Sequence, residues 1–218
     1  MILYGSSLSP YVRKVLAYAG EKGIELELMP TGKAPGQPSD EFLEASPLRK
    51  MPAFRDDAYT LADSSAIIQY LEARFPEPTL IPADPRMRGR AIWFEEFADT
   101  SLIACSGKMF YNRVVLPRFQ GKPGDEEAAR TAECEELPAL LDYLETEVPE
   151  PGEFLIGGRI TLADIAIATP FPNFEHLGCQ RDHKRHARVY AYVDSILARR
   201  SFAPWIEREK SLLAKEPV

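Results

Sequence analysis

The segment from Met1 to Gly23 restricts the fold of this chain more than any other. It begins with the apolar run Ile2-Leu3-Tyr4, which has the length of a short buried strand. A polar turn over residues 5–8 follows, and Ser9-Pro10 then begins a segment whose apolar residues recur at helical spacing. Serine is a favoured N-cap residue, proline fits the first helical position, and Gly20 and Gly23 provide a stop. The chain is therefore predicted to begin with a strand, a turn and a capped helix.

This arrangement places several hydroxyl groups beside the start of a helix. Ser6, Ser7 and Ser9 all lie in or next to the predicted turn. A helix N-terminus carries about half a positive charge and stabilises a nearby anion. The turn is thus a candidate anion site.

The next fifty residues alternate between strand and helix patterns. Strands are expected at Ile24–Met29, Lys50–Arg55 and Tyr59–Leu61, a loop at Pro30–Pro38, a short helix at Ser39–Leu43, and a longer helix capped by Asp63 or Ser64. The first two strands flank a helix long enough for a parallel crossover, whereas the last two are joined by a tight turn. A small mixed sheet with helices against it is the result, which is an α/β fold.

The second half of the chain has a different sequence pattern. Residues 75–85 contain four prolines and are predicted to be a semi-rigid linker. Beyond them only helical patterns occur, including one that begins with a capping-box sequence at Thr161–Asp164. We therefore expect an α/β domain over residues 1–78, a linker over 79–85 and an all-helical domain over 86–218.

Composition narrows the class of protein. The 218 residues carry a net charge of −7, which argues against binding to nucleic acid. No apolar run approaches the roughly 20 residues of a membrane span, and no secretory signal is recognisable. The three cysteines are far apart, as is usual for reduced thiols. A cytoplasmic protein that binds neither nucleic acid nor membranes is expected.

Four short motifs, taken in this order and spacing, resemble those of the glutathione S-transferase family. They are Ser-Leu-Ser-Pro-Tyr-Val-Arg-Lys-Val at 7–15, Lys-Met-Pro-Ala at 50–53, Leu-Ala-Asp-Ser-Ser-Ala-Ile at 61–67 and Thr-Leu-Ala-Asp at 161–164. The resemblance covers nearly the whole chain. It implies a thioredoxin-like N-terminal domain that binds glutathione, followed by an all-helical C-terminal domain. It also implies a homodimer, with glutathione as co-substrate, no metal, and a hydrophobic electrophile as the second substrate.

The resemblance also implies roles for individual residues. Met51-Pro52 matches the apolar residue and cis proline at which the family pairs with the cysteinyl part of glutathione. Asp63 and Ser64 match the acidic residue and serine that hold the γ-glutamyl end, although the family usually has the longer Glu in place of Asp. The alternative is that both residues are simple helix caps, because caps favour these same residue types. Lys50 would lie near the glycyl carboxylate.

The catalytic hydroxyl is expected at Ser9, which is in register with the catalytic serine of the serine-type classes. A thiol with a pKa near 8.5 is only a few per cent ionised at neutral pH, and the thiolate is the nucleophile. A donor at a helix N-terminus suffices to favour the thiolate. Ser6, Ser7 and Tyr4 remain alternatives, since the tyrosine-type classes use a residue near the end of the first strand.

Other functions and sites stay open at this stage. A glutathione-binding or ligand-carrying protein without turnover, a glutathione-dependent isomerase or peroxidase, and an interaction scaffold would all suit the same fold. Tyr11, Phe110 and Tyr111 are candidates to line an electrophile site between the domains. Cys179, His183 and His186 have a spacing that suggests a metal, but without a fourth ligand we interpret them as solvated loop and helix start.

Overall fold

The computed structural model describes residues 1–34, 36–150 and 152–214. The chain forms two compact units. One comprises Met1–Leu80 with Arg200–Glu209, and the other comprises Ile81–Arg199 with the chain from Lys210 onward. The linker at 79–85 stays a prediction. The structure also adds the C-terminal segment Arg200–Glu209 to the first unit, which the sequence patterns had not indicated.

The first unit contains the strands and the helices next to them. Its strands are β1 (Ile2–Tyr4), β2 (Glu27–Met29), β3 (Gly32–Ala34), β4 (Gln37–Pro38), β5 (Ala53–Asp56) and β6 (Tyr59–Ala62). Its helices are α1 (Pro10–Glu21), α2 (Asp40–Ala45) and α3 (Ser64–Arg74), and α11 (Ala203–Ala214) begins here. The expected loop at residues 30–38 instead contains the small hairpin β3–β4, and β2 is shorter than its alternating pattern indicated.

The described residues of this unit form a mixed sheet in the order β2-β1-β5-β6. β1 runs parallel to β2 and antiparallel to β5, and β5 runs antiparallel to β6. The predicted mixed α/β arrangement is confirmed. Strands β1 and β2 are joined through α1, as a parallel pair requires, whereas β5 and β6 are joined by a tight turn.

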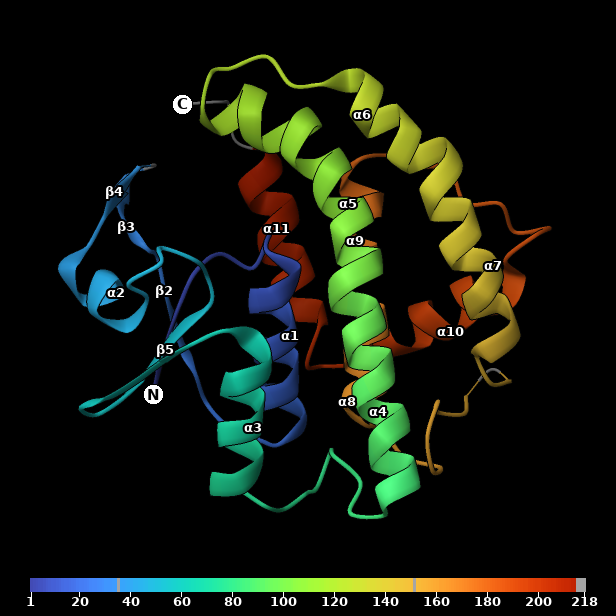
Figure 1. Cartoon of the computed structure of the whole chain (residues 1–218), viewed down its shortest axis with the longest axis horizontal. Helices are drawn as coiled ribbons and strands as arrows, with labels where there is room; N and C mark the ends of the chain where they lie inside the picture. Colours follow the sequence, from blue (N-terminus) through green and yellow to red (C-terminus); the bar gives the residue numbers. More distant parts are fainter. Residues whose placement is uncertain (35, 151, 215–218) are drawn as a thin grey trace. The chain divides into compact units, whose positions relative to one another are not determined.

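Both faces of the sheet are covered by helices. Tyr4 packs against Phe42 of α2, with ring centroids 6.3 Å apart. The neighbouring residue Leu3 points to the opposite face, because side chains alternate along a strand. On that face Phe54 contacts Tyr70 of α3 at 5.5 Å, and α3 lies beside α1 (Figure 1). Leu3 and Phe54 are fully buried.

All the regular structure that the described residues of the second unit form is helical, as predicted. It contains α4 (Pro85–Phe97), the π-helical segment η1 (Ala98–Leu102), α5 (Ile103–Phe110), the π-helical segment η2 (Tyr111–Phe119), α6 (Glu126–Thr131), the π-helical segment η3 (Ala132–Glu136), α7 (Leu137–Glu147), α8 (Leu162–Ala168), α9 (Phe171–His176) and α10 (Ala187–Leu197). Among the described residues, no helix is both long and apolar enough to cross a bilayer.

Buried Asp164 organises the start of α8. Its carboxylate accepts hydrogen bonds from the Thr161 amide at 2.7 Å, the Thr161 hydroxyl at 2.9 Å and the Tyr192 hydroxyl at 2.6 Å. It also accepts one from the Leu155 amide at 2.8 Å. The predicted capping box is confirmed, and it does more than close one helix, because it joins α8 to α10 and to the preceding loop.

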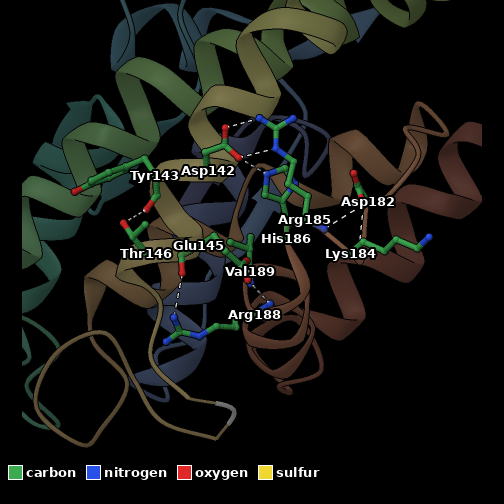
Figure 2. A network of polar contacts seen from close by, with 10 residues as sticks. All are labelled: Asp142, Tyr143, Glu145, Thr146, Asp182, Lys184, Arg185, His186, Arg188 and Val189. Atoms are coloured by element: carbon green, nitrogen blue, oxygen red, sulfur yellow. Dashed lines mark hydrogen bonds and ion pairs between the residues drawn. The ribbon is translucent and has the colours of Figure 1, made fainter.

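Helices α7 and α10 are joined by a second polar network (Figure 2). Glu145 of α7 accepts hydrogen bonds from the amides of Arg188 and Val189 at 3.0 Å each, so it caps the start of α10. In return, the Arg188 guanidinium donates to the carbonyls of Glu145 and Val148 at the end of α7, at 3.1 and 2.6 Å. Each helix thereby satisfies the unpaired backbone groups of the other.

Candidate functional site

The sheet register brings three turns of the first unit to one edge. Tyr4, the last residue of β1, is opposite Ala53, the first residue of β5. Ala53 is in turn opposite Ala62, the last residue of β6. Neighbouring strands are about 4.8 Å apart. The turn after β1, the turn before β5 and the turn after β6 therefore lie within about 10 Å of each other, and they carry the residues that the sequence motifs singled out.

Gly5 allows the first of these turns to pack closely. Its amide donates to the carbonyl of Met29 at 2.8 Å, and its φ of 153° is one that side-chain-bearing residues rarely adopt. A Cβ at this position would lie 2.6 Å from Cγ2 of Val12 and 3.5 Å from Cβ of Met51. The turn after β1 is thus in contact with both α1 and the Met51 turn. This close approach requires glycine at position 5.

Ser9 is the N-cap residue of α1, as predicted. Its backbone is extended, its carbonyl accepts from the Arg13 amide at 2.9 Å, and Pro10 is the first helical residue. The Ser9 side chain, however, makes no capping hydrogen bond with the described backbone. Because the hydroxyl is half-buried and not engaged in capping, it can donate to a ligand at the positive end of α1.

The second turn presents Lys50, Met51 and Pro52. The Met51–Pro52 peptide bond is cis, and Pro52 immediately precedes β5. Met51 is 40% exposed although it is apolar, and Lys50 is exposed as well. The hydroxyl of buried Ser46 bonds to both the amide and the carbonyl of Lys50. No sequence motif singled out Ser46, since nothing local in the sequence indicates a partner four residues away.

The third turn is the N-terminus of α3. Asp63 caps this helix, because its Oδ1 accepts from the amides of Ser65 at 2.9 Å and Ala66 at 3.1 Å. Its φ of 81° is unusual for a residue with a side chain, and such strained positions tend to occur at functional sites. Ser64, the first residue of the helix, is almost fully buried. Asp63 is therefore a helix cap. The cap uses the amides of Ser65 and Ala66 and does not use the amide of Ser64.

Comparisons with known proteins agree on one family. Residues 3–79 match the family model described as glutathione S-transferase, N-terminal domain, and residues 113–209 match the corresponding C-terminal domain. Human glutathione S-transferase theta-1 is 32% identical over 180 residues, which cover 82% of this chain and 75% of that protein. The chain belongs to the glutathione S-transferase family.

Further relatives support this assignment. Rat maleylacetoacetate isomerase is 31% identical over 175 residues, 79% of this chain and 76% of that protein. The apo structure of human glutathione S-transferase T1-1 superimposes with a TM-score of 0.82 at 26% identity, covering 99% of this chain and 92% of that one. A glutathione S-transferase from Methylobacterium radiotolerans, in complex with glutathione sulfonate, superimposes with a TM-score of 0.76 at 26% identity. The match covers 94% of this chain and 93% of that one. The fold is that of the glutathione S-transferases.

The three alternative hydroxyls of the sequence analysis differ in burial and in hydrogen bonding. Tyr4 is 5% exposed and belongs to an apolar cluster with Phe42, Ala45 and Ala53 beneath α2. The Ser6 hydroxyl accepts from the amide of Leu8 at 3.4 Å. Ser7 is fully buried, and its hydroxyl has no hydrogen-bond partner among the described residues.

The remaining candidates lie in different surroundings. Tyr11 is half-buried on α1, whereas in the second unit Phe110 is buried and Tyr111 is 49% exposed. Burial, aided by nearby Glu133, raises the pKa of the Cys179 thiol to about 12. No group of metal-ligating residues occurs in the part of the chain that the structure describes. His186 instead contacts Asp142, with its Nε2 3.0 Å from Oδ1.

Proposed function

We propose that this protein is a cytoplasmic, homodimeric glutathione transferase, which activates the thiolate of glutathione for attack on a hydrophobic electrophile. The observation that carries the proposal is the convergence of the Ser9, Met51 and Asp63 turns at one sheet edge. A tripeptide is long enough to contact all three turns at once. Membership of the glutathione S-transferase family supports glutathione as that tripeptide.

Each turn would bind a different part of glutathione. The γ-glutamyl carboxylate would accept from the Ser64 amide and hydroxyl at the start of α3, and the Asp63 carboxylate would bind the ammonium group. The cysteinyl part would pair with the main chain of Met51, as an added strand does. Lys50 would attract the glycyl carboxylate. The thiol would then lie near Ser9.

Ser9 and the start of α1 supply enough stabilisation for the thiolate. Lowering a thiol pKa by two units requires about 2.7 kcal/mol. A hydrogen bond to a charged acceptor contributes about 1.5–3 kcal/mol, and a helix N-terminus about 0.3–1 kcal/mol. No general base is needed, because the sulfur loses its proton to solvent before it attacks.

Two measurements on the intact protein test the proposal. Calorimetry should detect glutathione binding, and turnover with a chloroaromatic electrophile should be saturable in glutathione. Binding without turnover across several electrophiles would favour a ligand-carrying protein. Absence of glutathione binding would contradict the proposal, and sedimentation analysis would test the homodimer.

A glutathione-dependent isomerase is the second candidate. The similarity to rat maleylacetoacetate isomerase favours it, and the chemistry uses the same thiolate. In an isomerase glutathione adds to the substrate and is then released, so the thiol is not consumed. A transferase consumes one thiol for each product formed. Measuring free thiol during turnover of a cis-enone substrate therefore distinguishes the two activities.

A further inference from the structure

The loop that leads into Met51 has no packed side chain of its own. Its residues Pro47, Leu48, Arg49 and Lys50 are all exposed, and Leu48 is 81% exposed although it is apolar. A loop without buried side chains is held only by its hydrogen bonds and its backbone preferences. The conformation of this loop therefore depends on a small number of backbone contacts.

Ser46 makes the contacts that hold this loop. Its hydroxyl accepts from the Lys50 amide at 3.1 Å and donates to the Lys50 carbonyl at 2.7 Å. Its carbonyl also accepts from the amide of Arg49 at 2.9 Å. Arg49 has a φ of 57°, which an ordinary residue adopts only when its surroundings impose it. One side chain thus satisfies both backbone groups of the residue before Met51.

Ser46 is itself fixed to α2, and α2 packs against the sheet. It is the C-cap residue of α2, it is buried, and its amide donates to the carbonyl of Phe42 at 2.7 Å. Phe42 and Ala45 of the same helix belong to the buried cluster that includes Ala53 at the start of β5. A continuous series of contacts therefore runs from the core beneath the sheet to the backbone at Lys50.

We propose that Ser46 is a positioning residue of the glutathione site. It touches no part of the ligand, and it acts by holding the backbone of Lys50, and hence of Met51, in the direction that receives the cysteinyl part. This assignment rests on the proposed function for its ligand. The geometry of the loop itself is independent of that function.

The test compares two serines at opposite ends of α2. Ser46→Ala removes the hydroxyl that bonds to Lys50, whereas Ser39→Ala removes the N-cap hydroxyl, which accepts from the Phe42 amide at 3.2 Å. Both variants lose a helix-end hydroxyl, so both should lose stability. Only Ser46→Ala should raise KM for glutathione, by about threefold to tenfold, with kcat at saturating glutathione unchanged. Amide exchange at Lys50 should become faster in that variant alone.

Two results would overturn the proposal. One is an equal rise in KM in both variants, which would mean that loss of α2 stability accounts for the effect. The other is an unchanged KM and unchanged Lys50 amide exchange in Ser46→Ala. If the unmodified protein binds no glutathione, the proposed function fails, and amide exchange at Lys50 still shows whether Ser46 holds the loop.

Discussion

Arg13 and Glu209 form a bidentate ion pair in which both side chains are fully buried. Nε of Arg13 lies 2.8 Å from Oε1, and Nη2 lies 2.6 Å from Oε2. The pair joins α1 to α11 inside the first unit. Arg13 is also the residue whose amide donates to the Ser9 carbonyl, so the ion pair fixes the helix that begins at the candidate catalytic serine.

Breaking this ion pair from one side should be strongly destabilising. Arg13→Met leaves the Glu209 carboxylate buried without this partner, and Glu209→Leu does the same to the guanidinium. We expect each single variant to lose about 3–5 kcal/mol of unfolding free energy, because a buried charge loses its bidentate partner. The double variant should lose much less than the sum. Urea denaturation of all four proteins measures this coupling, and additive losses would contradict it.

Ser9→Ala should change the ionisation of bound glutathione more than its affinity. Loss of the hydroxyl removes a donor to the thiolate, so the pKa of the bound thiol should rise by about 1–2 units. Turnover at neutral pH should fall about tenfold to a hundredfold, and the pH dependence of kcat/KM should shift upward. Ser39→Ala is the control, since it removes the N-cap hydroxyl of α2, which is not a candidate donor to the thiol. An unshifted profile in Ser9→Ala would exclude Ser9 as the donor.

Variants at Asp63 should separate its capping role from its proposed role in binding. Asp63→Asn keeps an oxygen for the amides of Ser65 and Ala66 but loses the charge. We expect near-normal stability and about tenfold weaker glutathione binding. Asp63→Gly loses the cap but relieves the positive φ, so it should be less destabilising than Asp63→Ala. Thermal unfolding and calorimetry measure both effects, and normal binding by Asp63→Asn would leave Asp63 as a cap only.

Local patterns were sufficient to predict most of the fold. β1, α1 and α3 were found because strand length, capping residues and helical spacing are properties of neighbouring residues. A shared site for Ser9, Met51 and Asp63 was implied by the family resemblance, whose motifs lie at element ends. The hairpin at residues 30–38 was missed, because its glycines and prolines are equally typical of a loop.

Contacts between distant residues could not be predicted in this way. Arg13 and Glu209 are 196 positions apart, and either residue alone looks like an ordinary surface charge on an amphipathic helix. The role of Ser46 could not be predicted either, although its partners are near it in sequence. That role depends on the positive φ of Arg49 and on the burial of α2. Residues that support a site through tertiary contacts leave little trace in the local sequence.

The polar network between α7 and α10 should make stability depend on pH through Asp142. Its carboxylate accepts two hydrogen bonds from the Arg185 guanidinium, at 2.8 and 2.6 Å, and also contacts His186 (Figure 2). The Arg185 hydrogen bonds, followed by that of His186, lower the pKa of Asp142 below its ordinary value. A carboxyl whose pKa is lower in the folded state stabilises the fold above its unfolded pKa of about 3.9.

That contribution is lost as the pH falls through the folded-state pKa. Asp142→Asn should therefore unfold at a lower temperature than the unmodified protein at pH values well above 4, and the difference should shrink as the solution is acidified. Thermal unfolding across this range measures the difference, with the exposed Glu153→Gln as a control for general charge effects. A difference that stays constant from neutral to acid pH would show that Asp142 acts through packing and neutral hydrogen bonds, and not through its charge.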